Sequence, residues 1–115
     1  MKICVPCYRG GLDDLVCEHF GRAVAFTIYD TETGEITIVK NTSEHFGGKG
    51  KPPELLKKYG VDVVLCSGMG ARAISMFKQF GIKVYMGAVG TVRDAINQYF
   101  EGKLIEADEH MGCIH

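Results

Sequence analysis

The sequence predicts an α/β protein, built as a three-layer α/β/α sandwich around a mixed five-stranded sheet. The first observation behind this prediction is an almost continuously apolar run, Val61–Cys66, which is typical of a strand covered on both faces. A helical pattern over 71–80 and a second β-rich run, Ile82–Met86, follow it. Strand, helix and strand form one crossover unit, so the two strands should be parallel. The second observation is a pair of alternating runs, 24–30 and 35–40, which a short turn joins into an antiparallel hairpin.

The other elements follow in chain order. Residues 2–5 form a short apolar strand, a helix starts at Pro52, and Thr91 caps the last helix. After that helix, Leu104-Ile105 could pair briefly with an edge of the sheet. The predicted order is therefore βββαβαβα, in one domain over residues 1–105 with a tail over 106–115. In such a fold, ligands bind at the carboxyl ends of the parallel strands, where loops meet helix N-termini.

Composition limits the classes of function. The chain has 115 residues, enough for one core, with 13 basic and 14 acidic side chains. This balance gives no electrostatic reason to expect nucleic acid as a partner. No apolar run approaches the roughly 20 residues that span a membrane, and the N-terminus enters a strand without a signal peptide, so we expect a cytoplasmic protein. Five cysteines are an odd and high number for that reducing compartment, which favours metal binding, redox chemistry or buried thiols over disulfides.

Three thiols are predicted to converge at one edge of the sheet. Cys7 and Cys66 lie at or just beyond the carboxyl ends of predicted strands. Cys17 lies on the loop that leaves Cys7, two residues before His19. Soft thiolates at one rim favour iron–sulfur clusters, copper(I) or zinc. For Cys66, simple burial is the favoured interpretation.

The spacing Cys4-x-x-Cys7 is that of half a metal or redox motif. Cys4 falls inside a strand, however, and is favoured as a small core residue. A redox pair normally opens a helix, whose N-terminus lowers the thiol pKa, and here a glycine-rich loop follows instead.

The tetrapeptide Glu-His-Phe-Gly occurs twice, at 18–21 and 44–47, on loops that flank the hairpin. Imidazoles on glycine-flanked loops suit metal or ligand capture, which makes His19 and His45 candidates. The alternative is that the phenylalanines anchor the loops and the histidines lie at the surface. At the C-terminus, Cys113-x-His115 is either a chelating pair that completes a coordination shell or a disordered end.

The stretch from Gly68 and Gly70 to Ala73 fits the G-x-G-x-x-A pattern of dinucleotide-binding turns. No acidic residue closes the following strand, so we reject a nicotinamide cofactor. The glycines either let an anionic ligand approach the backbone or serve a tight turn. The sequence has no nucleophile-elbow or phosphate-loop motif and no clustered carboxylates, and the pair Asp13-Asp14 is typical of a solvated loop, so we expect no enzyme activity.

Several phrases resemble the dinitrogenase iron–molybdenum cofactor biosynthesis family over about residues 1–105. They are His-Phe-Gly-Arg-Ala from His19, Val-Asp-Val-Val from Val61, Ser-Gly-Met-Gly from Ser67, Gly-Thr-Val from Gly90, and Tyr-Phe-x-Gly-x-Leu from Tyr99. The resemblance implies a ribonuclease-H-like fold without nuclease activity. It also implies transient binding of iron–sulfur or heterometal clusters by a carrier rather than a catalyst.

The leading hypothesis is therefore a non-catalytic carrier of an iron–sulfur or iron–molybdenum-type cluster, with cluster donor and acceptor proteins as partners. Cys7, Cys17 and His19 are the first candidate ligands. The other candidates are His45 and Cys113 closing over the cluster, the backbone N–H groups of Gly68 and Gly70, and Arg22 balancing its charge. Two alternatives remain open: a thiol–disulfide redox protein using Cys4 and Cys7, and a metal-free regulatory or interaction domain.

Overall fold

The computed structural model describes residues 1–41 and 52–108, which form one mixed six-stranded sheet and three α-helices. The strands are β1 (Lys2–Cys7), β2 (Ala25–Asp30), β3 (Ile36–Lys40), β4 (Val63–Cys66), β5 (Lys83–Met86) and β6 (Ile105–Glu106). The helices are α1 (Pro52–Lys58), α2 (Ala71–Gln79) and α3 (Val92–Phe100), together with a short 3-10 helix, η1 (Phe20–Arg22). The strand order across the sheet is β3-β2-β1-β4-β5-β6.

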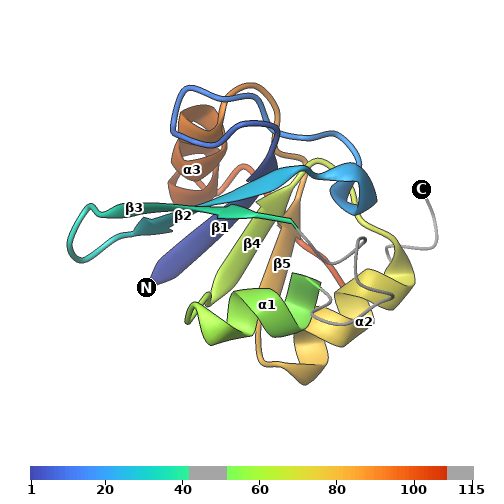
Figure 1. Ribbon diagram of the computed structural model, residues 1–115. Helices are drawn as coiled ribbons and strands as arrows, with labels where there is room; N and C mark the ends of the chain where they lie inside the picture. Colours follow the sequence, from blue (N-terminus) through green and yellow to red (C-terminus); the bar gives the residue numbers. More distant parts are fainter. Residues whose placement is uncertain (42–51, 109–115) are drawn as a thin grey trace.

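Helices cover both faces of this sheet. Helix α3 lies on one face, and α1 and α2 lie on the other (Figure 1). The central strands β1, β4 and β5 are parallel, whereas β2 and β3 form the expected antiparallel hairpin beside β1. The predicted α/β class, crossover unit and hairpin are therefore confirmed.

The expectation of five strands is wrong by one short strand. Ile105 and Glu106 pair antiparallel with Met86 and Tyr85 of β5 and form β6 at the edge of the sheet. Two residues are too few to show the alternation of a strand in a sequence. The pairing also carries the ordered fold one residue into the segment that was predicted to be tail.

The ends of two helices follow from local sequence. The side chain of Thr91 accepts a hydrogen bond from the Asp94 amide (3.1 Å), and the Asp94 carboxylate accepts one from the Thr91 amide (3.0 Å), which is the predicted capping box of α3. Helix α2 begins differently, because Gly70 occupies its N-cap position and offers no capping side chain. This uncapped helix end faces the candidate site described below.

The core has one part on each face of the sheet. Cys4 and Cys66 are completely buried on the face covered by α1 and α2, as predicted for both. Cys7 is buried on the opposite face, beneath α3 and the loop that follows β1. Phe20 packs against Phe26 and Phe77, with ring centroids 5.7 Å and 5.3 Å away, so it anchors η1 to the core.

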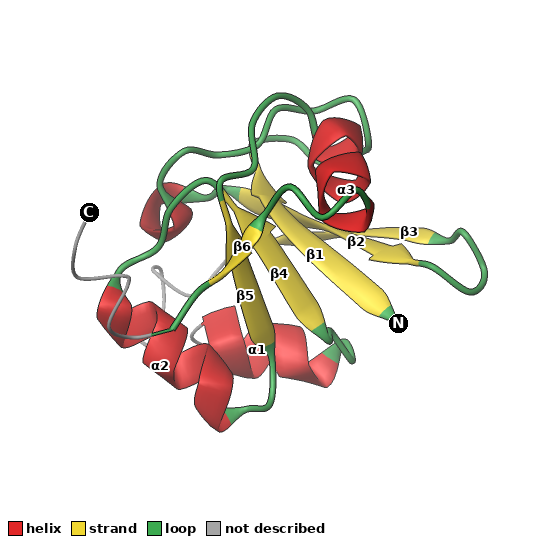
Figure 2. Ribbon diagram, turned by 180° about the vertical axis from the view of Figure 1, so that it is seen from behind, coloured by secondary structure: helices red, strands yellow, loops and turns green. Residues whose placement is uncertain are grey.

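The carboxyl ends of β1, β4 and β5 lie at the same end of the strands, and the loops that follow them gather there (Figure 2). We call this end of the strands the carboxyl edge of the sheet. The chain adds β2 and β3 on one side of β1, and then β4 and β5 on its other side, so the topological switch point lies between β1 and β4. Ligands of open α/β sheets bind at such a switch point. No helix among the described residues is long and apolar enough to cross a membrane.

Candidate functional site

A pocket of about 850 Å³ opens at this edge of the sheet. Its lining comes from the loop after β1, the turn after β4, the first residues of α2 and the loop after β5. The lining residues are Tyr8, Leu15, Val16, Glu18, His19, Phe20, Gly21, Ser67, Gly68, Met69, Gly70, Ala73, Val89 and Gly90. The pocket therefore lies where the fold class predicts a ligand.

Backbone pairing joins the loops around this pocket. His19 and Gly68 form an isolated parallel β-bridge between the loop after β1 and the turn after β4. The Val16 amide donates to the Gly90 carbonyl oxygen (2.9 Å), which ties the first loop to the loop after β5. The Ser67 hydroxyl donates to the Ala88 carbonyl oxygen at 2.5 Å, and this hydrogen bond joins the turn after β4 to the loop after β5.

Asp14 organises the loop that carries half of the pocket wall. One carboxylate oxygen, Oδ2, accepts hydrogen bonds from the amides of Tyr8 (2.8 Å), Arg9 (2.6 Å) and Gly10 (2.8 Å), and Oδ1 accepts one from Leu15 (2.8 Å). Partial burial acts to raise the pKa of Asp14, but these four hydrogen bonds outweigh it and lower the pKa to about 2.

The role of Asp14 was not predicted from the sequence, in which the pair Asp13-Asp14 reads as a solvated loop. Asp13 does match that prediction, because its carboxylate makes only an exposed ion pair with Arg93 at 3.3 Å. The signal that could have separated the two residues is the position of Asp14 a few residues after Gly10-Gly11, where a tight turn leaves amides without partners.

At three positions of the pocket lining, the backbone conformation does not require glycine. Eight of the described glycines have positive φ angles, which favour glycine for conformational reasons. The described glycines without such an angle are Gly21, Gly68 and Gly70, and all three line the pocket. A Cβ atom at any of the three would meet no other atom within 4 Å. Neither strain nor crowding therefore requires glycine at these positions, and each of them faces open space.

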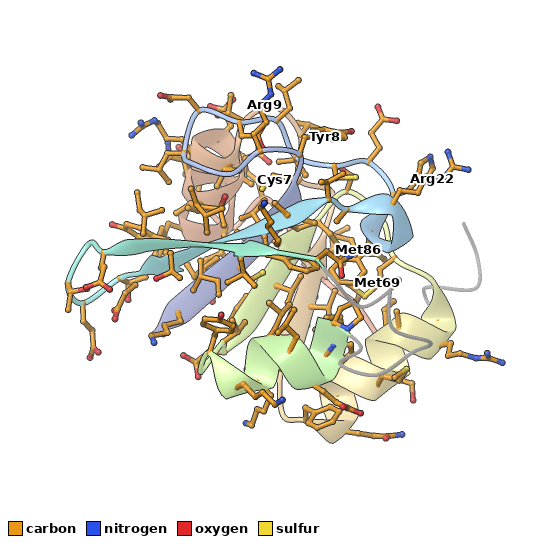
Figure 3. The ribbon with its side chains drawn as sticks, in the orientation of Figure 1. Cys7, Tyr8, Arg9, Arg22, Met69 and Met86 are labelled. Atoms are coloured by element: carbon orange, nitrogen blue, oxygen red, sulfur yellow. The ribbon has the colours of Figure 1, made fainter. Side chains whose placement is uncertain are left out.

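The candidate residues separate into two groups. His19, Gly68 and Gly70 line the pocket, as predicted. Arg22 lies next to it in η1, with its side chain extended away from the sheet (Figure 3). Cys7 and Cys17 do not belong to the lining, although they lie in the same loop region. His45 and Cys113 lie outside the described residues.

The thiol of Cys7 points into the core rather than into the pocket. Its Sγ atom lies 3.2 Å from the Thr27 hydroxyl oxygen and 3.5 Å from the Ala25 carbonyl oxygen. Burial raises the pKa of Cys7 to about 11 and that of Cys66 to about 12. Metal binding requires a thiolate, and burial disfavours that form of both thiols in this structure.

Cys17 is also buried, and its thiol donates to the His19 carbonyl oxygen at 3.3 Å. A hydrogen bond with the Cys17 thiol raises the pKa of the Tyr8 phenol, so Cys17 lies next to a residue of the pocket lining. Within residues 1–41 and 52–108, no three histidine, cysteine or acidic side chains come together as a metal-binding group. The predicted convergence of Cys7, Cys17 and His19 on one metal is therefore not observed.

The geometry also opposes a redox couple of Cys4 and Cys7. The two residues lie three positions apart in β1, in core clusters on opposite faces of the sheet. At about 3.3 Å per residue their Cα atoms are roughly 10 Å apart, beyond the limit of about 7 Å for a disulfide. All four described cysteines are free thiols.

The fold and the pocket define a small α/β domain with a glycine-lined pocket at the carboxyl ends of its parallel strands. The model of the family described as "Dinitrogenase iron-molybdenum cofactor" matches residues 1–102, and the chain belongs to this family. An uncharacterised protein of Methanocaldococcus jannaschii is 34% identical over 109 residues, which cover 90% of this chain and 89% of the relative.

Two solved structures have the same fold at similar identity. The apo form of the orange protein from Desulfovibrio gigas superposes with a TM-score of 0.83, at 32% identity and with 92% of each chain covered. A protein from Thermotoga described as a putative NifB protein superposes with a TM-score of 0.79, at 36% identity and with 91% of each chain covered.

Proposed function

We propose that the chain is a non-catalytic carrier that binds an anionic iron–sulfur or iron–molybdenum-type cluster in the pocket. The observation that carries the proposal is the set of Gly21, Gly68 and Gly70, which line the pocket without any conformational need for glycine. Membership of the dinitrogenase iron–molybdenum cofactor family supports a metallocluster as the cargo. The designation of the Desulfovibrio gigas relative as an apo form supports a ligand-binding role for the fold.

The start of α2 supplies the attraction for an anion. The amide of Ile74 makes the first backbone hydrogen bond of the helix, to the Gly70 carbonyl oxygen (3.1 Å), so the preceding amides of the first turn have no partner within the helix. These amides and the helix dipole favour negative charge at the helix N-terminus. Gly70 has no side chain to cap them, so the sulfide or oxo ligands of a cluster can accept their hydrogen bonds.

His19 adds an imidazole to the residues that line the pocket. Its backbone is fixed by the bridge to Gly68, and its side chain lies in the pocket lining. An imidazole can ligate iron or donate a hydrogen bond to a bridging sulfide. The cluster is then held by backbone amides and one side chain rather than by several thiolates. A load held in this way can be released, as carriage requires.

Anaerobic reconstitution with iron and sulfide, with and without molybdate, tests this proposal. Visible absorption and metal analysis are measured after desalting for the wild type, His19→Ala and the double variant Cys7→Ser/Cys17→Ser. We expect stoichiometric metal in the wild type, less in His19→Ala, and wild-type loading in the double variant, since neither thiol lines the pocket.

Two results would overturn the proposal in different ways. A wild-type chain that stays colourless and metal-free is not a cluster carrier. Loading that disappears in the Cys7→Ser/Cys17→Ser variant, with the fold intact by circular dichroism, would move the ligands to the thiols and away from the glycine-lined pocket.

A further inference from the structure

The loop after β5, residues 87–91, forms part of the pocket wall. Val89 and Gly90 belong to the pocket lining. Gly87 and Gly90 have φ angles of 99° and 89°, so the chain turns on both sides of Val89. Ala88 is completely buried, whereas Val89 is 63% exposed and lies outside both β5 and α3. The hydrogen bonds that hold Val89 come from a side chain elsewhere in the fold.

Gln98 of α3 supplies these hydrogen bonds from nine positions further along the chain. The Val89 amide donates to the Gln98 side-chain oxygen (3.2 Å), and the Gln98 side-chain nitrogen donates to the Val89 carbonyl oxygen (2.9 Å). A side-chain amide offers an acceptor and a donor side by side, which is what the two backbone groups of one residue require. Gln98 itself does not belong to the pocket lining.

The helix that carries Gln98 is a firm support. Val92 and Ala95 of α3 are completely buried in the core. The Val92 amide donates to the Asp14 carbonyl oxygen (2.8 Å). The Arg93 amide donates to the Leu12 carbonyl oxygen (2.9 Å). Helix α3 is therefore fixed both to the sheet and to the loop after β1, which supplies another part of the pocket lining.

The position of Val89 determines the position of the next residue of the pocket wall. The Gly90 carbonyl oxygen accepts a hydrogen bond from the Val16 amide (2.9 Å), and both Gly90 and Val16 line the pocket. A change in the backbone at Val89 therefore alters the place where the loops after β1 and β5 meet.

Loss of the Gln98 hydrogen bonds should affect cargo binding more than folding. Val89 is exposed, so water replaces both hydrogen bonds when the side chain is removed, and the net loss of folding free energy is small. The cargo, in contrast, then binds beside a wall that is no longer fixed. Its binding includes the entropy cost of ordering residues 89–90.

We infer that Gln98 is a positioning residue of the proposed cargo site. By holding Val89 it keeps the Gly90 part of the pocket wall in place, and it thereby slows release of the cargo. This inference rests on the proposed carrier function.

The same substitution at two neighbouring positions of α3 tests the inference. Gln98→Leu removes both hydrogen bonds, and Asn97→Leu is the matched control, since Asn97 is an exposed amide side chain of the same helix. The first readout is hydrogen exchange of the Val89 amide in the ¹⁵N-labelled chain without cargo. The second is the rate at which a ferrous-iron chelator removes iron from each chain after anaerobic reconstitution with iron and sulfide. Urea unfolding measures the stability of each variant.

Gln98→Leu should raise the exchange rate of the Val89 amide about tenfold and should lose iron about tenfold faster than the wild type. A factor of ten corresponds to about 1.4 kcal/mol, which is the contribution of one or two such hydrogen bonds. Asn97→Leu should match the wild type in both rates. The urea midpoints of the two variants should be similar, because the Gln98 hydrogen bonds lie at the surface.

Three results would overturn the inference. Faster exchange at Val89 with unchanged iron loss would show that the hydrogen bonds are structural only. Unchanged exchange at Val89 would show that Gln98 does not hold the loop. Equally fast iron loss from Asn97→Leu, or a urea midpoint of Gln98→Leu that falls well below that of Asn97→Leu, would assign the effect to the helix or to global stability.

The wild-type chain separates this inference from the proposed function. A wild type that loads no metal removes the proposed cargo and, with it, the role of Gln98 in retaining it. Normal loading of the wild type with equal iron loss from Gln98→Leu removes the inference alone and leaves the carrier function in place.

Discussion

His19 and Gly68 form an isolated parallel β-bridge between segments that lie 49 positions apart in the chain. The bridge joins the loop after β1 to the turn after β4, so it holds these two parts of the pocket lining side by side at the start of α2. One partner of the bridge brings an imidazole and the other brings a backbone without a side chain. The two features that the sequence marked as candidates, the first Glu-His-Phe-Gly and the Gly-x-Gly turn, are thereby brought together.

Substitution of Gly70 should separate stability from function. In Gly70→Asp the new carboxylate caps α2 and stabilises the fold by up to about 1 kcal/mol, because the N-cap of this helix has no capping side chain. The same negative charge repels an anionic cargo. We expect an unchanged or higher urea midpoint together with at least tenfold lower metal loading.

Gly70→Asn is the matched control for that experiment. Asparagine caps a helix about as well as aspartate and has nearly the same size but no charge. Its metal loading should lie between those of the wild type and Gly70→Asp. Equal losses for the two variants would mean that bulk, not charge, excludes the cargo, and wild-type loading by Gly70→Asp would contradict the proposed site.

Asp14 should stabilise the fold in a pH-dependent way. Its pKa is lowered from 3.8 to about 2 by four backbone hydrogen bonds, so its contribution is complete above about pH 4 and is lost as the pH falls through 2. Asp14→Asn should cost about 1 kcal/mol of unfolding free energy at pH 7, since the carboxylate is partly exposed to solvent. Urea titrations should show a constant deficit from pH 5 to 8 that shrinks below pH 4.

Asp13→Asn provides the control for Asp14. Its exposed ion pair with Arg93 contributes little, so the change should stay below about 0.5 kcal/mol. A deficit of equal size in both variants would show that loop charge, rather than the hydrogen bonds of Asp14, stabilises this region.

The buried thiols should resist alkylation in the native state. Burial raises the pKa of Cys7 to about 11 and that of Cys66 to about 12, and it raises the pKa of Cys4 well above its ordinary value. At pH 8 the thiolate of Cys7 is populated at about one part in a thousand. Iodoacetamide at pH 8 should leave these three cysteines unmodified in peptide mapping, whereas the chain in urea reacts at all of them. Native labelling of Cys7 at the unfolded rate would contradict its placement beneath the loop.

Phe20 should be the most sensitive residue of the loop that carries His19. It packs against Phe26 and Phe77, so Phe20→Ala removes two aromatic contacts and leaves a cavity, at a cost of about 3 kcal/mol. The exposed Phe100 is the control, and Phe100→Ala should cost less than about 1 kcal/mol. Thermal unfolding of the two variants measures the difference, and similar values would show that Phe20 does not anchor η1.

The sequence was informative about the fold where periodicity is strong. The apolar run at Val61–Cys66 and the glycine stop after α2 correctly predicted the parallel unit and the edge of the sheet at which the pocket lies. It indicated β6 only as a brief edge pairing of Leu104-Ile105, one residue before the observed strand, because a strand of two residues is defined by its pairing partner Tyr85–Met86 and not by a pattern of its own.

The candidate ligands could be predicted only in part. Chain position places Cys7 at the correct end of β1, but the strand pleat and the hydrogen bond to Thr27 decide that its thiol points into the core. The role of Asp14 depends on amides that turn toward it only after the loop has folded. Glycine at 68 and 70 was visible in the sequence, whereas the absence of any conformational need for it requires φ angles and neighbouring atoms.

The measurement that tests the central claim most directly is an amide NMR spectrum of the ¹⁵N-labelled chain before and after anaerobic reconstitution with iron and sulfide. A bound paramagnetic cluster broadens or shifts nearby amide signals. The pocket predicts that the strongest effects fall on residues 18–21, 67–73 and 89–90, while α1 and the β2–β3 hairpin remain unchanged. Effects centred on any other part of the chain, or a spectrum identical before and after reconstitution, would contradict the assignment of this pocket as the cargo site.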